Sequence, residues 1–95
     1  MVKLIWTDQA IRDLTDIGEY IAQNSEQYAK LTIQKIYSRT NILKSLPFAG
    51  RTVPEKSEDS LRELIEGNYR IFYEVVSNNQ INILGVYHSA RDLSK

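Results

Sequence analysis

The feature that most constrains the fold is a run of three extended segments between residues 61 and 91. Residues 69–76 and 81–88 are rich in β-branched and aromatic side chains, which favour strands, and residues 61–66 precede them. Turn-forming residues at 67–68 and 77–80 separate the three segments. The pattern predicts three consecutive antiparallel strands joined by short hairpins.

The register of the second hairpin decides which side chains share a face, because a slip of one residue flips every side chain. An odd-length loop would pair Arg70 with His88 and gather the polar side chains, Asn82 included, on one face. A two-residue Asn78-Asn79 loop suits the turn chemistry, but it scatters Asn82 and His88 onto the apolar face. We predict the first register, because burying an unpaired Asn or His costs about 1–3 kcal/mol each.

The first half of the chain predicts a short strand and two helices. Residues 2–6 alternate in polarity, and Thr7 is a favourable N-cap for a helix that runs to about Gln23. Ser25 can cap a second helix, which ends before Pro47. So short a break implies an antiparallel helical hairpin. Its apolar stripes are Ala10, Leu14, Ile17 and Ile21 in the first helix and Ala29, Ile33, Ile36, Thr40 and Leu43 in the second.

The order β-α-α-β-β-β predicts an α+β fold in a single domain over residues 1–95. The helical hairpin is expected to cover one face of a small, mainly antiparallel sheet and to leave the other face partly open. Residues 47–60 show no periodicity and contain both prolines. We expect them to form a long loop that is functional or mobile.

Composition narrows the function classes. The chain has no cysteine and one histidine, so we expect no disulfide, no metal site and no cofactor. No apolar run approaches the length of a membrane span, which favours a cytoplasmic protein. Lys+Arg and Asp+Glu number 12 each. This balance argues against a protein that neutralises many phosphates.

Six charged or titratable residues form the candidate site on the open face. They are Arg51 and Glu55 on the loop, Arg62 and Arg70 on strands, His88 at a strand end and Arg91 just after it. Converging arginines suit phosphate or carboxylate recognition. A Glu base, an Arg cation and a His acid could together cleave RNA without metal. Taken singly, surface arginines are more often solvated, but Arg70 lies between Tyr69 and Ile71 in the middle of the predicted sheet, where it needs a partner or a purpose.

Four blocks of the chain closely resemble the RelE/ParE superfamily of bacterial type II toxins. The blocks are KLIWTDQAIRDLTDIGEYI, PFAGRTVPE, LRELIEGNYRIFYEV and VYHSARDL, and together they span nearly the whole sequence. The resemblance implies the β-α-α-β-β-β fold predicted above. It also implies a cognate antitoxin that wraps the toxin with an extended or helical segment, in a hetero-oligomer.

The superfamily divides by target, and the blocks favour the ParE-like branch, whose members poison DNA gyrase. The long hairpin, the Gly50-Arg51 pair and the ending at His88 are ParE-like, and the lysines of RelE-like members near the second strand are absent. The resemblance therefore implies a gyrase inhibitor that is not an enzyme. Its expected target-binding residues are Arg51, Arg62, Arg70 and Arg91.

The alternative is a ribosome-dependent mRNA endoribonuclease of the RelE or YoeB type, which needs no metal. Through the resemblance, Glu55, Arg70 and His88 take the catalytic positions of that type. Ser89 replaces the aromatic residue that ends the YoeB-type pattern, which weakens stacking on a cleaved base. A third alternative is an inactive relative that only binds its antitoxin.

Overall fold

The structure is a computed structural model that describes residues 2–89. It has the predicted order of elements, with one short strand inside the predicted loop. The elements are β1 (Lys3–Trp6), α1 (Asp8–Ala22), α2 (Glu26–Arg39), the 3-10 helix η1 (Thr40–Lys44), β2 (Arg51–Thr52), β3 (Leu61–Glu66), β4 (Tyr69–Ser77) and β5 (Gln80–His88).

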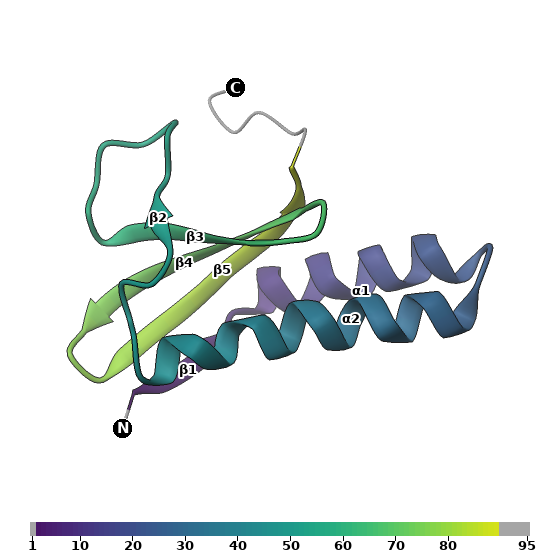
Figure 1. The fold of residues 1–95 in the computed structure, drawn as a ribbon, viewed down its shortest axis with the longest axis horizontal. Helices are drawn as coiled ribbons and strands as arrows, with labels where there is room; N and C mark the ends of the chain where they lie inside the picture. Colours follow the sequence, from purple (N-terminus) through teal and green to yellow (C-terminus); the bar gives the residue numbers. More distant parts are fainter. Residues whose placement is uncertain (1, 90–95) are drawn as a thin grey trace.

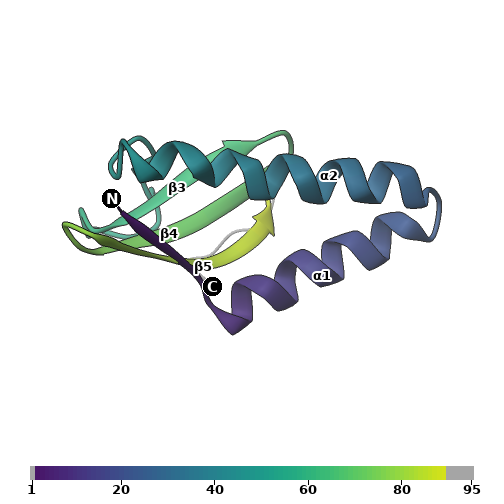
Figure 2. The same ribbon diagram turned by 90° about the horizontal axis from the view of Figure 1, so that it is seen from below.

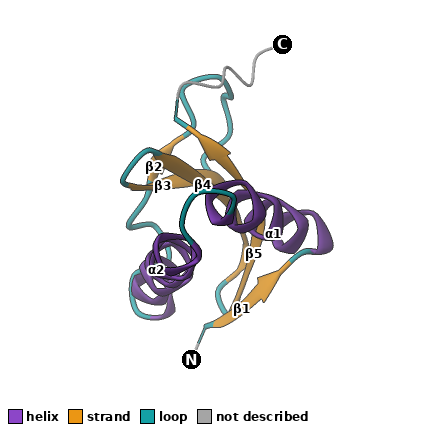
Figure 3. Cartoon of the chain, turned by 90° about the vertical axis from the view of Figure 1, so that its right-hand side faces the viewer, coloured by secondary structure: helices purple, strands orange, loops and turns teal. Residues whose placement is uncertain are grey.

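The strands form one sheet in the order β1-β5-β4-β3-β2. β1 runs parallel to β5 and the other pairs are antiparallel. The helices run side by side against the sheet, and their connecting turn lies beyond the ends of the strands (Figures 1 and 2). Figure 3 looks at the molecule from the side of that turn and shows both helices nearly end-on beside the sheet. The predicted α+β class with a helical hairpin is therefore confirmed.

Both predicted N-caps are confirmed. The Thr7 hydroxyl accepts a hydrogen bond from the Ala10 amide, and the Ser25 hydroxyl accepts one from the Tyr28 amide. Each satisfies one of the amides that a helix start leaves unpaired. No helix within residues 2–89 is long and apolar enough to cross a membrane.

The core lies between the hairpin and one face of the sheet. Its buried members are Ala10, Ile36, Leu43, Leu64, Ile71, Tyr73, Ile81, Ile83 and Val86. Tyr73 is fully buried, and its hydroxyl accepts a hydrogen bond of 2.9 Å from the amide of Gly50. That bond fixes the start of β2 to the centre of the core.

Replacing Tyr73 with Phe is expected to lower the free energy of unfolding by about 1–2 kcal/mol at neutral pH, because the buried Gly50 amide loses its acceptor. Burial raises the pKa of Tyr73 above its ordinary value of 10.0. The unfolded chain therefore releases this proton first, and wild-type stability falls as the pH rises through 10. The difference in the free energy of unfolding between wild type and Tyr73→Phe should therefore narrow from pH 7 to 11, as measured by urea denaturation. Tyr69 also has a raised pKa, but both proteins retain it, so it does not affect the difference between them. A difference in the free energy of unfolding that stayed constant with pH would contradict the prediction.

The predicted register of β4 and β5 is wrong. Ser77 pairs with Gln80, so the loop is the two-residue Asn78-Asn79 turn. Tyr69 pairs with His88, and Arg70 pairs with Tyr87 instead of His88. The chemistry of the turn, and not the segregation of polar side chains, decides where this hairpin closes.

Two irregularities reconcile that turn with a buried apolar face. Val76 is an extra residue near the turn, and Leu84 is an extra residue between the pairs Phe72–Gly85 and Tyr73–Ile83. Because side chains alternate along a strand, each bulge exchanges the faces of the residues beyond it. The second bulge places His88 on the helix-covered face beside Tyr69, where their ring centroids are 5.9 Å apart.

A side chain from α1 stabilises this second bulge. Asp13 accepts a hydrogen bond of 3.0 Å from the amide of Val86, beyond the end of β1. A Cβ on Gly85 would lie 2.9 Å from the same carboxylate oxygen, so glycine permits the approach. The register of β5 therefore depends on a contact across 73 residues of sequence.

Candidate functional site

Four charged residues form a connected group on the open face of the sheet, which we call the open-face cluster: Arg51, Glu55, Glu63 and Arg70. Arg70 Nε donates to Glu63 Oε1 at 2.6 Å, and Arg51 Nε donates to Glu63 Oε2 at 2.5 Å. The Nη1 and Nη2 atoms of Arg70 donate to the two oxygens of Glu55 at 2.9 and 2.7 Å. Arg70 is thus held along two edges by two carboxylates.

The cluster is buried at its centre and exposed at its margin. The side chain of Glu63 is 0% exposed and that of Arg70 is 7% exposed, whereas that of Arg51 is 61% exposed. The hydrogen bonds to Glu55 raise the pKa of Arg70 above the ordinary arginine value; Glu63 adds to the rise and burial opposes it. Arg70 therefore stays charged wherever the protein is folded, and it depends on both carboxylates for its pairing.

Two aromatic rings extend the cluster across the open face. The Arg70 guanidinium lies 4.8 Å from the ring centroid of Phe72, and Phe72 lies 5.5 Å from the ring of Tyr87. A pocket of about 180 Å³ adjoins both rings and is also lined by Val53 and Lys56. The open face thus places a paired guanidinium next to a small, mostly apolar pocket.

Arg62 does not share the face of Arg70, so that expectation is wrong. It pairs with Tyr73 across β3 and β4, whereas its neighbour Glu63 pairs with Phe72 on the open face. Its guanidinium donates to the carbonyls of Asp59 and Gly50 and lies 5.0 Å from the ring centroid of Phe48. These contacts hold the two ends of the loop. Arg91 lies outside the described residues.

The three residues expected at nuclease positions are only partly brought together. Glu55 and Arg70 are in direct contact through two hydrogen bonds. His88 lies on the opposite face of the sheet, beside Tyr69. Within residues 2–89, no group of three His, Cys, Asp or Glu side chains is arranged to hold a metal ion.

Sequence reasoning missed Glu63, which joins the two arginines. An acidic residue next to Arg62 in a half-exposed strand resembles a solvated side chain, and the search for converging arginines favours Arg62 on the open face in its place. The signal that could have found Glu63 is alternation, because Leu64 is apolar and its neighbour Glu63 must therefore face the other way. Arg70 then acquires an acidic neighbour across the hairpin.

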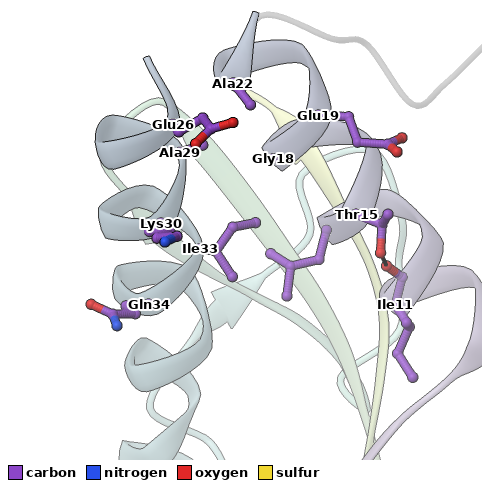
Figure 4. A pocket seen from close by; sticks show the side chains of 11 residues that line it. Ile11, Thr15, Gly18, Glu19, Ala22, Glu26, Ala29, Lys30, Ile33 and Gln34 are labelled. Atoms are coloured by element: carbon purple, nitrogen blue, oxygen red, sulfur yellow. Dashed lines mark hydrogen bonds between the residues drawn. The ribbon is translucent and has the colours of Figure 1, made fainter.

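The helical hairpin carries a second candidate surface, a groove of about 710 Å³ between α1 and α2. We call it the hairpin groove; Figure 4 shows Ile33 of α2 pointing between the two helices near Gly18. A Cβ on Gly18 would lie 3.1 Å from Ile33 Cδ1, so glycine allows the helices to approach here. Ile11 in the groove is 50% exposed, which leaves apolar surface open to a partner. The lining residues are Ile11, Leu14, Thr15, Gly18, Glu19, Ala22, Glu26, Ala29, Lys30, Ile33 and Gln34.

Comparison with known families agrees with this architecture. Residues 4–93 match the family described as the ParE toxin of the type II toxin–antitoxin system parDE. A curated protein from Caulobacter vibrioides, Toxin RelE2, is 29% identical over 91 residues, covering 96% of this chain and 99% of that protein.

Solved structures share the fold. A chain from the chromosomal ParDE toxin–antitoxin system of P. aeruginosa superposes with a TM-score of 0.75 at 24% identity, over 93% of this chain and 96% of the other. The YoeB/ParE toxin from Agrobacterium tumefaciens gives 0.60 at 19% identity, over 92% and 98%. A chain of the toxin–antitoxin complex RelBE2 from Mycobacterium tuberculosis gives 0.59 at 18% identity, over 92% and 96%.

Proposed function

This chain belongs to the ParE toxin family of type II toxin–antitoxin systems, and we propose that it inhibits DNA gyrase in the cytoplasm by binding rather than by catalysis. The proposed contact surface is the open face of the sheet, where Arg51 presents an exposed guanidinium beside the buried Arg70. Guanidinium groups pair well with carboxylates. The expected gyrase surface is therefore acidic.

The observation that carries this proposal is the separation of Arg70 from His88. Metal-free RNA cleavage needs a base, an acid and a cation around one phosphate. Arg70 and His88 lie on opposite faces, and both Glu55 oxygens already bind Arg70. Equal numbers of acidic and basic residues also favour a protein target over the anionic ribosome.

The direct test measures gyrase with purified protein. We expect several-fold excess of this chain to reduce DNA supercoiling and to raise the level of gyrase–DNA cleavage complexes. Arg51→Ala should weaken both effects, because Arg51 is exposed and offers its charge to the target. Unchanged supercoiling and cleavage at this excess would sink the gyrase assignment.

A second candidate function is ribosome-dependent mRNA cleavage. The names of the Caulobacter relative and of the Agrobacterium toxin support it, as does the contact between Glu55 and Arg70. Toeprinting on stalled ribosomes decides between the two. A-site cleavage that His88→Ala abolishes would replace the gyrase proposal. No effect in either assay, and no growth arrest on overexpression, would favour an inactive relative.

We further propose that a cognate antitoxin occupies the hairpin groove with the apolar face of a helix. The P. aeruginosa neighbour belongs to a ParDE toxin–antitoxin system, and the M. tuberculosis neighbour is part of a toxin–antitoxin complex. The groove is long, mostly apolar and lined by residues of both helices (Figure 4). An amphipathic helix buries its apolar stripe in grooves of this kind.

Ile11→Asp should weaken antitoxin binding at least about tenfold, because it places a charge where an apolar contact is buried. Ile11 is half exposed in this chain, so the fold should tolerate the change. Leu46→Asp is the matched control, since Leu46 is 57% exposed and lies outside the groove. Calorimetric titration with the antitoxin measures both variants. Equal affinities would move the antitoxin away from this groove.

A further inference from the structure

The two carboxylates that hold Arg70 come from structurally different places. Glu63 belongs to β3, directly beside β4, and its side chain is completely buried. Glu55 belongs to the loop between β2 and β3, and its side chain is 15% exposed. Glu63 aligns the Nε edge of Arg70 from within the sheet, whereas Glu55 covers the Nη edge from the solvent side.

Apart from this pair, the loop that carries Glu55 is held to the rest of the protein mainly near its two ends. Near β3, the carbonyls of Ser60 and Asp59 accept hydrogen bonds from the Val75 amide and from Arg62 Nε. The backbone bonds from Lys56 to Val53 and from Leu61 to Glu58 only close turns inside the loop. Val53 is buried, but residues 54 and 56–59 are exposed. Segments with few buried contacts open at the lowest free energy. Glu55 can therefore leave Arg70 while Glu63 stays in place.

The charges of the cluster select the ligand that would take the place of Glu55. Two arginines and two glutamates sum to zero, and departure of Glu55 leaves one net positive charge on the remaining three. One monovalent anion restores neutrality. The carboxylate of Glu55 shows how such an anion would bind, because its two oxygens lie 2.9 and 2.7 Å from Nη1 and Nη2 of Arg70. A second carboxylate fits that planar fork.

We propose that Arg70 is an anion-binding site whose internal ligand is Glu55 and whose external ligand is a carboxylate of the protein target. The inference rests on the proposed function and names the chemical group that the target supplies. The adjoining pocket of about 180 Å³, lined by Val53, Phe72 and Tyr87, takes an apolar side chain beside that carboxylate. The target segment is an acidic residue next to an apolar one.

Release of Glu55 also regulates affinity. The target binds only molecules in which Glu55 has left Arg70, so the apparent affinity is reduced by the fraction in that state. Removing the Glu55 side chain abolishes the competition. If Glu55 is released in about one molecule in ten, Glu55→Ala binds the target about tenfold more tightly than wild type. Arg70→Lys, which cannot form the two-point contact, loses that gain.

The site is tested on the isolated protein with acetate as the probe, at constant ionic strength set by chloride. Acetate should raise the melting temperature of Glu55→Ala in a saturable manner, by about 4 °C at several times its dissociation constant. Wild type should show a rise of at most about 1 °C, because Glu55 occupies the site in most molecules. Glu58→Ala, an exposed change on the same loop, is the matched control. The double variant Glu55→Ala/Arg70→Lys should lose the response.

Three results would overturn the site. The first is that acetate leaves the melting temperature of Glu55→Ala unchanged. The second is that acetate raises the melting temperature of Glu58→Ala by the same amount as that of Glu55→Ala. A larger rise with dimethyl phosphate than with acetate would replace the protein carboxylate with a nucleic-acid backbone. If Glu55→Ala does not fold, Glu55→Gln gives the same reading through the NMR signal of Arg70 Nε–Hε, which should move on addition of acetate.

The gyrase assay separates this inference from the function on which it rests. If wild type inhibits gyrase but acetate leaves Glu55→Ala unchanged, the function stands and the site fails. If acetate binds but gyrase is unaffected, the site stands and its natural target is a different acidic protein. When both hold, Glu55→Ala should inhibit gyrase at about a tenth of the wild-type concentration.

Discussion

Glu63→Ala is expected to lower the free energy of unfolding by about 3–5 kcal/mol, the range found when one partner of a buried ion pair is removed. Glu63 accepts hydrogen bonds from both Arg51 and Arg70. Its removal takes the carboxylate away from the Nε edge of Arg70, a residue that is only 6% exposed to solvent. Urea denaturation at pH 7 measures the loss.

The loss should not depend on pH between neutral and mildly alkaline conditions. The raised pKa of Arg70 means that its stabilising contribution is complete below the ordinary arginine value and disappears only above it. The buried cation therefore cannot relieve the loss of Glu63 by deprotonation. Glu66→Ala, on the same strand but only partly buried, is the control and should stay within about 0.5 kcal/mol of wild type.

A double variant distinguishes an uncompensated charge from a lost contact. Glu63→Leu/Arg70→Met replaces the central pair with apolar side chains, and most of the lost stability should return. If Glu63→Ala alone stays within about 1 kcal/mol of wild type, the cluster is hydrated in solution and Arg70 is not structurally demanding. The pairing with Glu55 and Glu63 also explains why a long cation is buried between Tyr69 and Ile71 in the middle of the sheet.

The fold could be predicted because its signals are local. Thr7 and Ser25 mark the helix starts by their own side chains, and each accepts the expected amide hydrogen bond. The apolar stripes place both helices on the sheet, and β-branched and aromatic runs mark the strands. Even the close approach of the helices is visible as Gly18 in an otherwise unbroken helical pattern, opposite Ile33.

The site could not be predicted to the same extent, because its geometry depends on contacts distant in the chain. The bulge at Leu84 exchanges the faces of the last residues of β5, and it is stabilised by Asp13 in α1. The sequence of the hairpin alone predicts that side chains alternate between the two faces of the sheet without interruption along β5. One extra residue then moves His88 away from Arg70 and brings Tyr87 beside it. The sequence identifies Arg51, Glu55 and Arg70 as candidates but misses Glu63, which joins the two arginines. The faces on which the candidates lie depend on the tertiary structure.

Gly50→Ala should lower the free energy of unfolding by about 3–5 kcal/mol, because it overpacks the core and disturbs a buried hydrogen bond. A Cβ at this position would overlap the backbone carbonyl oxygen of Glu63 and lie 2.7 Å from Tyr73 Oη. The Glu63 carbonyl belongs to a paired strand, and the Tyr73 ring is fully buried. Neither neighbour can turn away, so the backbone at the start of β2 must move.

Gly67→Ala is the matched control for this last substitution. Gly67 has a φ of 58° and no atom within 4 Å of an added Cβ, so it isolates the backbone cost of about 1–2 kcal/mol. Gly50 does not have a positive φ, so the larger loss of stability expected for Gly50→Ala would come from packing. In a Tyr73→Phe background the Gly50→Ala loss should shrink, because the Oη overlap and its hydrogen bond are already gone. Urea denaturation of the four proteins measures the coupling. Simple additivity would mean that the glycine matters for a reason other than its contact with the Tyr73 hydroxyl, since the ring atom Cε1, 2.8 Å from an added Cβ, is retained in phenylalanine.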